Sequence, residues 1–245
     1  MTNESTKPPL NGLRVLDLSR VLAGPFCSMT LSDMGAEIIK VEMPGRGDDT
    51  REFPPFIKGE SSYFISLNRG KKSITLNLKE EQAREVFYKI AEKSDIILEN
   101  FRPGVTERLG VDYETIKKIN PKIIYCSISS FGQTGPYNQW PGYDLIIQGM
   151  GGLMGLTGEP NGPPVRVGVA VTDLCAGMYA TIGILGALRA REESGRGQYI
   201  DVGMLDGSVS WMTYAAGNYF ATGTNPPRMG SAHPSIAPYQ SFKAG

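Results

Sequence analysis

The sequence predicts an α/β fold in which a parallel β-sheet is flanked by helices. Short apolar runs with strand character alternate with segments of helical periodicity, and strands separated by helices pair in parallel. The first strand–helix–strand stretch, residues 13–42, has the usual length of a βαβ unit. With 245 residues, 40% of them hydrophobic, the chain can bury the core of one or two domains.

Strands are expected where apolar residues cluster in short runs such as L-R-V-L-D-L and I-I-K-V-E. The run S-I-T-L-N-L alternates apolar and polar residues, as a strand with one solvated face does. The expected strands are residues 13–18, 38–42, 73–78, 95–99, 122–129 and 199–204, with a further strand-like run at 165–171.

Helices are expected where apolar residues recur at helical spacing. Pro103 lies near the first turn of a helix that follows E-N-F-R, and Gly195 ends a long Gly/Ala-rich helix. The other expected helices are residues 26–34, 79–93, 113–119 and 205–220, and the long one covers 173–191. This order of elements predicts a sheet of Rossmann type in the N-terminal part of the chain.

Two segments are expected to be loops. Residues 44–60 are rich in Pro, Gly and charge, and residues 131–164 are dense in glycine. Glycine at such density favours tight turns and close backbone approach to a ligand, although ordinary loop chemistry is the alternative. The chain ends at S-F-K-A-G without a capping helix, so we expect it to stop within a domain.

Composition narrows the possible functions. Lys plus Arg (25) balance Asp plus Glu (25), so no basic field favours nucleic acid. We expect no apolar run of the ~18 residues that a transmembrane helix needs, and the polar N-terminus lacks a signal-peptide core. A cytoplasmic protein is therefore expected. Cys27, Cys126 and Cys175 lack metal or disulfide spacing, so we expect no structural metal and no disulfide framework.

A single histidine limits the catalytic chemistry. His233 lies in the loop-like stretch R-M-G-S-A-H-P-S and is the only histidine of the chain. Ser-His-Asp or Cys-His catalysis would need it, and a His-rich metal site is excluded. If the protein is an enzyme, its chemistry is expected to rest on carboxylates, lysines, tyrosines or a cofactor.

Asp173 is the leading candidate for a reactive carboxylate. It follows the strand-like run 165–171 and begins the long helix. At a strand-to-helix junction a carboxylate faces unpaired N–H groups and the positive end of the helix dipole, so we expect Asp173 to be ionised. On this segment alone, a structural N-cap is the favoured interpretation, because Asp is a common cap residue, and only the rest of the chain favours a reactive role.

The loops that follow the expected strands offer nucleotide-binding groups. The first loop, S-R-V-L-A-G-P, lacks the G-x-G-x-x-G of dinucleotide sites, which tells against a nicotinamide-dependent oxidoreductase. Asn100, Phe101 and Arg102 end the fourth strand, where an amide, a flat ring and a guanidinium suit an adenine nucleotide with several phosphates. An exposed loop is the alternative there, and also for the basic cluster N-R-G-K-K-S at residues 68–73.

Together these motifs resemble one family along essentially the whole chain. The chain is similar to the class III CoA-transferases, which include formyl-CoA and carnitine CoA-transferases. The motifs that carry the resemblance are G-L-R-V-L-D-L-S-R-V-L-A-G-P, G-A-E-I-I-K-V-E, L-N-R-G-K-K-S-I-T-L-N-L, E-N-F-R-P-G-V, I-N-P-K-I-I-Y-C-S-I-S-S-F-G-Q-T-G-P-Y, V-T-D-L-C-A-G-M-Y-A and S-G-R-G-Q-Y-I-D-V-G-M-L-D. Seven motifs in the family's order are highly specific.

The resemblance implies transfer of CoA from an acyl-CoA to a carboxylic acid, with Asp173 as the catalytic residue. In the family an aspartate attacks the donor thioester, forms a mixed anhydride, and is converted into an aspartyl-CoA thioester that the acceptor carboxylate resolves. A carboxylate nucleophile needs no general base at neutral pH, which agrees with the scarcity of histidine. CoA is then a substrate, and no permanently bound cofactor or metal is implied.

The family's CoA-binding positions carry over to residues in several loops of this chain. They are Leu22, Ala23, Leu76, Lys79, Asn100, Phe101, Arg102, Arg108, Tyr143, Asp144 and Met204. One position departs from some relatives, which have an arginine where this chain has Met43. Arg46 or Lys72 is expected to replace that cation.

Two alternatives remain within the resemblance. Acyl-CoA racemases of the same fold use the histidine of a G-H-D motif, whereas this chain has G-Y-D with Tyr143, a poor base near neutral pH. The other alternative is an inactive, truncated chain, because family members have about 400 residues and form interlocked homodimers. The resemblance implies a Rossmann-like CoA-binding domain at residues 1–225, with residues 226–245 leading toward a smaller domain. No nucleic acid or membrane partner is expected.

Overall fold

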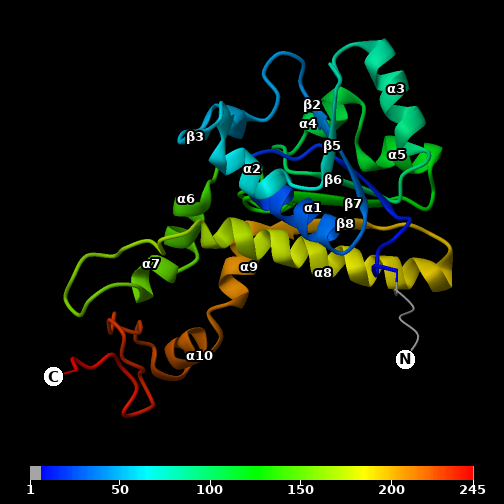
Figure 1. Cartoon of the computed structure of the whole chain (residues 1–245). Helices are drawn as coiled ribbons and strands as arrows, with labels where there is room; N and C mark the ends of the chain where they lie inside the picture. Colours follow the sequence, from blue (N-terminus) through cyan, green and yellow to red (C-terminus); the bar gives the residue numbers. More distant parts are fainter. Residues whose placement is uncertain (1–6, 245) are drawn as a thin grey trace, which may run out of the picture.

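The computed structural model describes residues 7–244, which are built around a six-stranded sheet (Figure 1). All neighbouring strands of this sheet pair in parallel, which confirms the predicted α/β fold with helices on both faces. The strands lie in the order β5 (Lys71–Thr75), β2 (Glu37–Glu42), β1 (Arg14–Asp17), β6 (Ile96–Glu99), β7 (Ile124–Ser129) and β8 (Tyr199–Gly203).

The strand order places a switch point at the middle of the sheet. From β1 the chain proceeds outward through β2 to β5, and it then returns to add β6, β7 and β8 on the other side of β1. The loops that leave β1 and β6 therefore diverge to opposite faces, which opens a crevice at the carboxyl ends of these strands. This crevice is where ligands of doubly wound sheets bind.

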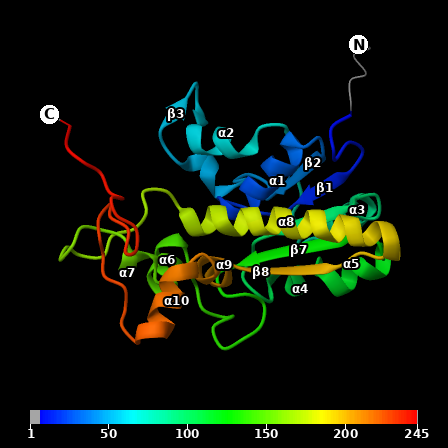
Figure 2. The same cartoon turned by 90° about the horizontal axis from the view of Figure 1, so that it is seen from below.

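The four inner strands of the sheet, β2, β1, β6 and β7, each place side chains in two hydrophobic clusters, one on either face. Val15 and Ile38 point into a cluster with helices α1 (Ala23–Asp33) and α8 (Val171–Ser194). Leu16 and Ile97 point the other way, toward α3 (Glu81–Ala91) and α5 (Tyr113–Ile119). The views in Figures 1 and 2 show these helices on the two faces of the sheet. This alternation is the period-2 pattern that a doubly covered sheet requires.

The remaining elements lie in connections and at the C-terminal side. They are η1 (Asp49–Glu52), β3 (Phe56–Ile57), β4 (Glu60–Ser61), α2 (Ser62–Asn68), α4 (Val105–Leu109), α6 (Asp144–Met150), α7 (Leu153–Leu156), α9 (Met204–Ser210) and α10 (Thr213–Thr222). The two short strands β3 and β4 form a separate antiparallel hairpin. In Figure 1, α10 and the segment after it extend away from the sheet, near α7.

Several predicted elements need correction. The expected strand at 165–171 is wrong, since residues 165–170 are irregular and α8 begins at Val171. The expected helix at 205–220 is two helices, α9 and α10, separated by Trp211 and Met212. The two expected loops contain regular structure as well, because residues 44–60 include η1 and β3, and residues 131–164 include α6 and α7.

Helix α8 also corrects the expectation about membrane spans. By length and composition it is apolar enough to cross a membrane, so the prediction that no apolar run reaches this length was wrong. A single helix of this kind is weak evidence for a span. In this fold α8 packs against α1, α9, β7 and β8, which explains why its sequence is rich in apolar and small residues.

Candidate active site

A cleft of about 460 Å³ lies at the carboxyl ends of the central strands. Its walls come from the loops after β1, β6 and β7, from the start of α6 and from the start of α8. Nine of the twelve predicted site residues line it: Leu22, Ala23, Asn100, Phe101, Arg102, Tyr143, Asp144, Asp173 and Met204. The cleft thus coincides with the crevice that the strand order creates.

Asp173 lies in the first turn of α8 and faces this cleft. The N-cap of the helix is Ala170, and no side chain caps it, so the structural N-cap interpretation of Asp173 is wrong. The carboxyl group is therefore free of the local task that Asp most often performs at a helix start.

The charge state of Asp173 differs from the expectation. Burial raises the pKa of Asp173 to about 7, the nearby Asp144 carboxylate adds to this rise, and the backbone N–H of Ala23 opposes it. The prediction of a fully ionised carboxylate at neutral pH is therefore wrong. Loss of hydration outweighs the helix dipole here, because the side chain points into a partly enclosed cleft.

The start of α1 provides the N–H group that points at Asp173. Val21, just before the helix, has a φ of 67°, which is rare for a β-branched residue and marks a turn held in place by its surroundings. Leu22 is the N-cap of α1 and makes no side-chain capping bond. The backbone N–H of Ala23 can thus interact with the Asp173 carboxylate.

A buried glycine allows α8 to approach this turn closely. A Cβ atom at Gly177 would lie 2.6 Å from the carbonyl oxygen of Ala23 and 2.9 Å from the ring of Phe26. One turn earlier on the same helix is Asp173, so the contact at Gly177 sets the distance between the carboxylate and the N-terminus of α1.

Asp144 is held by a network that sequence reasoning did not find. Its Oδ1 atom accepts hydrogen bonds from the backbone N–H (2.9 Å) and the hydroxyl (2.8 Å) of Thr172. Its Oδ2 atom accepts one from the fully buried Gln148 (2.6 Å), whose own Oε1 accepts from the Val167 N–H (2.8 Å). Asp144 was predicted as a CoA contact, but both of its oxygens fix the segment that leads to Asp173.

The side-chain amide of Asn100 is likewise hydrogen-bonded to another part of the protein, the backbone of Arg20. Its Oδ1 accepts from the Arg20 N–H at 2.8 Å, and its Nδ2 donates to the Arg20 carbonyl at 2.7 Å. This two-point contact ties the loop after β6 to the loop after β1. The Arg20 guanidinium also lies 5.6 Å from the centre of the Phe101 ring, and the Phe101 N–H donates to Glu99 at 2.7 Å.

Three predicted residues lie outside the main cleft. Leu76 and Lys79 line an adjoining pocket of about 160 Å³, which shares Arg20 and Phe101 with the cleft. Arg108, on α4, lines neither of these two pockets. The adjoining pocket is also lined by Met43, where some relatives carry an arginine.

The cations of the basic cluster at residues 68–73 form ion pairs with carboxylates of the protein itself. Arg69 pairs with Asp33, Lys72 with Glu37 at 2.7 Å, and Lys71 reaches the buried Asp17. Lys72 lines neither pocket, so the expectation that it replaces the missing arginine finds no support in the geometry. The other candidate, Arg46, is exposed and pairs with Asp49, which lines the cleft.

Buried ion pairs fix the loops beneath the cleft. Lys40 is almost fully buried, pairs with Asp48 at 2.9 Å and donates to the carbonyl of Ser19 at 2.7 Å. The charges of Lys71 and Lys40, with hydrogen bonds from serine hydroxyls, outweigh burial and hold the pKa of Asp17 at about 2. These contacts are long-range, so no local motif could have indicated them.

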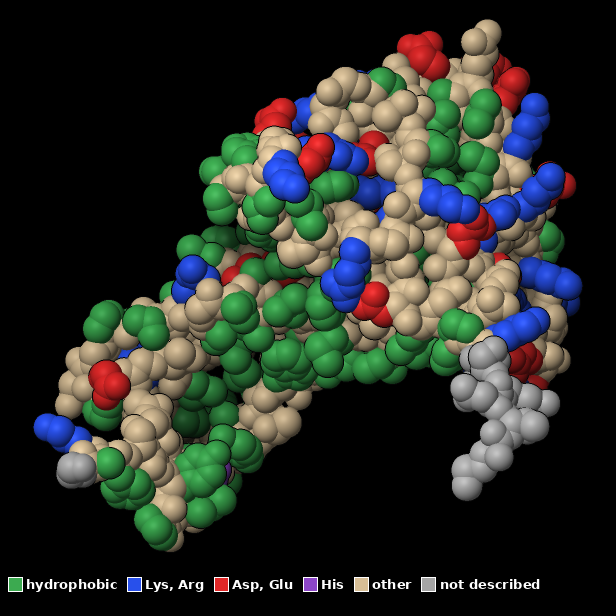
Figure 3. All heavy atoms as spheres, viewed as in Figure 1, with side chains coloured by type: hydrophobic (Ala, Val, Ile, Leu, Met, Phe, Trp, Pro, Cys, Tyr) green, Lys and Arg blue, Asp and Glu red, His purple; other side chains and the backbone are tan. Residues whose placement is uncertain are grey.

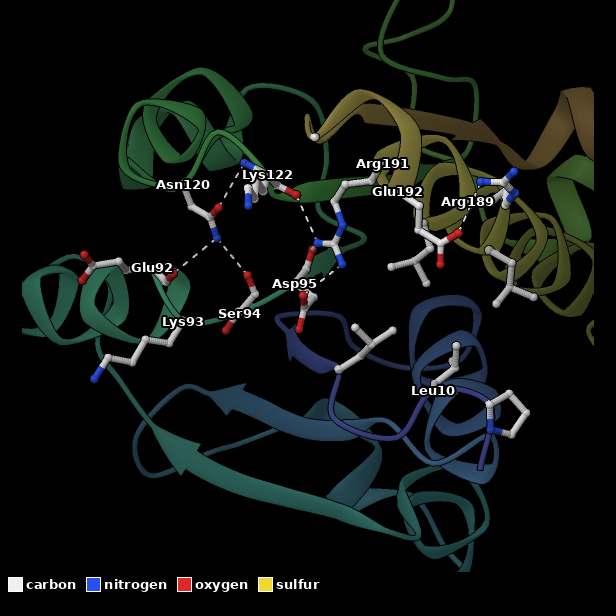
Figure 4. A pocket seen from close by; sticks show the side chains of 15 residues that line it. Leu10, Glu92, Lys93, Ser94, Asp95, Asn120, Lys122, Arg189, Arg191 and Glu192 are labelled. Carbon is white, nitrogen blue, oxygen red and sulfur yellow. Dashed lines mark hydrogen bonds and ion pairs between the residues drawn. The ribbon is translucent and has the colours of Figure 1, made fainter. Parts of the chain in front are cut away.

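The opposite edge of the sheet carries a different pocket (Figure 4). It has a volume of about 650 Å³, and its polar groups bind one another: Arg191 pairs with Asp95 at 3.0 Å, and the Asn120 amide donates to Ser94 at 2.8 Å. It lies at the amino ends of the strands, which are not the binding edge of such sheets. His233 lines neither this pocket nor the cleft and packs against Tyr214 and Tyr239.

Comparison with known proteins finds a family match along nearly the whole chain. The profile of CoA-transferase family III matches residues 10–245. Acetyl-CoA:oxalate CoA-transferase of Acetobacter aceti is 50% identical over 99% of this chain and 63% of its own length. Succinyl-CoA:glutarate CoA-transferase of Mus musculus is 50% identical over 96% of this chain and 54% of its own length.

A solved structure shows the same fold. A CAIB/BAIF family protein from Brucella suis superposes with a TM-score of 0.92 at 47% identity, covering 97% of this chain and 64% of that one. The chain therefore spans between about half and two thirds of the length of these relatives.

Proposed function

The chain belongs to CoA-transferase family III, and from this premise we propose that it transfers coenzyme A from an acyl-CoA donor to a carboxylic acid through intermediates on Asp173. The observation that carries the proposal is the Asp173 carboxylate itself, which is partly buried, makes no cap and faces the N-terminus of α1 in a cleft. A carboxylate nucleophile in such a setting needs no histidine.

The proposed reaction conserves the thioester and moves it between carboxyl groups. The ionised Asp173 attacks the donor carbonyl, the C–S bond breaks, and a mixed anhydride and CoA thiolate form. The thiolate attacks the aspartyl carbonyl, the acyl group leaves as a free acid, and an aspartyl-CoA thioester remains. The acceptor carboxylate attacks this thioester to give a second anhydride, from which the thiolate takes the new acyl group and releases Asp173.

The local geometry supports stabilisation of the charged intermediates. Each attack places negative charge on a carbonyl oxygen, and the uncapped N-terminus of α1 offers backbone N–H groups with a favourable dipole. The raised pKa of Asp173 reflects weak hydration, which makes the ionised form more reactive than a solvated carboxylate.

The two connected pockets support an extended CoA site. Phe101 and Arg20 lie at their junction, and Lys79 offers a cation in the outer pocket. We propose that the nucleotide end of CoA occupies this side and that the thioester reaches Asp173. Leu22, Ala23, Leu76, Arg102, Tyr143 and Met204 remain proposed contacts, and so does Arg108, which would have to reach the phosphates from outside both pockets.

Other properties implied by the family are proposals too. The racemase alternative finds no support, since the only histidine lies outside the cleft. We propose a homodimer, because α8 and α10 expose apolar side chains such as Ile182 and Phe220. The division into a large domain at residues 1–225 and a segment at 226–245 toward a smaller domain stays a prediction, as does a cytoplasmic location. Catalytic activity of this chain also stays a prediction, because an inactive truncated chain is the alternative.

Substitution of Asp173 tests the proposed function. Asp173→Ala should abolish CoA transfer between succinyl-CoA and a dicarboxylic acid in the intact protein, because the other cleft carboxylates, Asp49 and Asp144, are held by arginines or by hydrogen bonds. Binding of CoA, measured by calorimetry, should persist. Glu193→Ala, which removes an exposed carboxylate near the other end of α8, is the matched control and should retain activity. Turnover by Asp173→Ala at the rate of the control would refute the proposal.

A further inference from the structure

Arg166 is a cation in the cleft that no carboxylate neutralises. It lines the same cleft as Asp173, and within residues 7–244 it forms no ion pair. Its Nη1 atom donates to the carbonyls of Val167 (3.1 Å) and Gly168 (3.3 Å), while Nε and Nη2 have no partner in this part of the chain. One edge of the guanidinium is therefore available to a ligand.

Two other arginines near the cleft already pair with carboxylates. Arg20 pairs with Asp49 at 3.3 Å, and Arg51 forms a two-point contact with Glu42. Arg102 also lacks a carboxylate within the described residues, but it follows Phe101 on the β6 side, where the two pockets join. Arg166 instead belongs to the segment that leads directly into α8 and Asp173.

The segment that carries Arg166 is held in place from the protein core. Gln148 is fully buried on α6, and its Oε1 accepts the Val167 N–H at 2.8 Å while its Nε2 donates to Asp144 at 2.6 Å. Asp144 in turn accepts the Thr172 N–H at 2.9 Å. The backbone is thus fixed on both sides of residues 168–171, although these residues form no strand. A cation fixed in this way loses little entropy on binding.

The charge of the cleft defines what this cation can do. Asp144 and Asp173 both line the cleft, and neither forms an ion pair, so an anionic acid would be repelled as it approaches. An acid with two carboxylates would meet still more repulsion unless a cation received one of them. A guanidinium can bind a carboxylate with two parallel hydrogen bonds, which also fixes its orientation.

We propose that Arg166 binds the non-reacting carboxylate of a dicarboxylic acid substrate while the other carboxylate is directed at Asp173. Gln148 acts as a positioning residue that holds the Arg166 segment. This inference rests on the proposed function and extends it to the substrate class and the residue that selects it. Arg166 lines the main cleft and not the outer pocket, so its ligand is the acid and not the nucleotide end of CoA.

The test compares two acids of equal chain length, glutarate and pentanoate, on the intact protein. Arg166→Gln should raise the KM and Kd for glutarate roughly 10- to 100-fold, as expected for loss of hydrogen bonds between charged groups, and should change those for pentanoate by less than about twofold. Arg166→Lys should recover part of the glutarate affinity, because it restores the charge without the two-point contact. Arg102→Gln is the control and should leave the ratio between the two acids unchanged.

An equal loss for both acids, or an unchanged ratio in Arg166→Gln, would overturn the inference. Calorimetric Kd values for the two acids do not require turnover. Failure of Asp173 to react with acyl-CoA would therefore refute the proposed function, while the glutarate-to-pentanoate ratio would still decide the role of Arg166.

Discussion

The pKa of Asp173 depends on a small number of neighbouring groups. Burial and the Asp144 carboxylate raise it to about 7, and only the N–H of Ala23 acts in the other direction. Because the ionised form is the nucleophile, transfer activity should increase as the pH rises through about 7 and then level off. At neutral pH a sizeable fraction of the protein would hold Asp173 protonated.

Asp144→Asn should shift this pH dependence to lower pH. Removing the negative charge removes a cause of the raised pKa of Asp173, so the carboxyl group ionises more readily and half-maximal activity occurs below pH 7. The measurement is the pH profile of kcat/KM for the acyl-CoA donor, from pH 5 to 9 on either side of that midpoint.

Thr172→Val is the matched control for this prediction. It removes the hydroxyl that donates to Asp144 Oδ1 (2.8 Å) and to the Asp144 carbonyl (3.5 Å) but keeps both carboxylates, so its midpoint should stay near that of the unmodified protein. A midpoint that stays unchanged or rises in Asp144→Asn would show that the charge of Asp144 does not set the pKa of Asp173.

Sequence motifs pointed to residues that the fold gathers in one cleft, but not to the contacts that these residues make within the protein. The family resemblance identified Asp173, and the structure brings nine of the twelve predicted residues into one cleft. Asn100 and Asp144 proved to bind other parts of the protein. Gln148 and Arg166 were missed, because a buried glutamine on an unpredicted helix and a lone arginine in a loop carry no local signature. Their positions depend on a contact between two segments that are 19 residues apart in the sequence. Gln148 accepts the N–H of Val167, the residue next to Arg166.

At the scale of elements, the packing of α8 on α1 determines the geometry around Asp173. The two helices are in direct contact, and at Gly177 the contact is too close for a Cβ atom. The six strands of the main sheet and helices α1, α3, α5 and α8 were predicted near their observed positions, since their periodicity is strong and local, whereas β3, β4, α2, α6 and α7 were missed. The expected strand at 165–171 was wrong because this apolar run has no strand to pair with in this fold. The position beside β7 at the edge of the sheet is taken by β8.

Gly177→Ala should destabilise the protein and impair the site. Its Cβ would meet the Ala23 carbonyl oxygen at 2.6 Å, so the helices must separate, at a cost of about 1–3 kcal/mol in the free energy of unfolding. The same shift would move the Ala23 N–H relative to Asp173 and lower kcat. Urea unfolding and steady-state kinetics measure the two effects.

Gly186→Ala provides the comparison on the same helix. A Cβ there meets nothing within 4 Å, so the substitution should be neutral or stabilise the fold by up to about 1 kcal/mol through helix propensity. If both variants have the same unfolding midpoint, close packing at Gly177 does not position α8.

At the scale of the whole molecule, one face is apolar and uncovered. Figure 3 shows hydrophobic side chains along the part of α8 that faces away from the sheet and over α10. Met178, Ile182, Tyr214 and Phe220 are exposed there, the last by 82%. Exposed apolar side chains gathered in this way favour a protein partner, and they support the proposed homodimer.

Charge on this face should weaken the proposed homodimer. Ile182→Glu places a carboxylate on the exposed side of α8, which would be costly in an apolar interface but tolerable in water. Light scattering should find a dimer for the unmodified protein and a lower mean mass for the variant. Monomeric behaviour of the unmodified protein would contradict the proposal.

The most direct test of the central claim is to trap the covalent intermediate on Asp173. The protein is mixed with succinyl-CoA and hydroxylamine, which converts an aspartyl anhydride or thioester into a hydroxamate. Tryptic residues 167–189 contain Asp173 as their only acidic residue, so the mass of this peptide locates the reaction. The account predicts a modified peptide that is absent in Asp173→Asn. Turnover of succinyl-CoA with this peptide unmodified, or a hydroxamate on another residue, would contradict it.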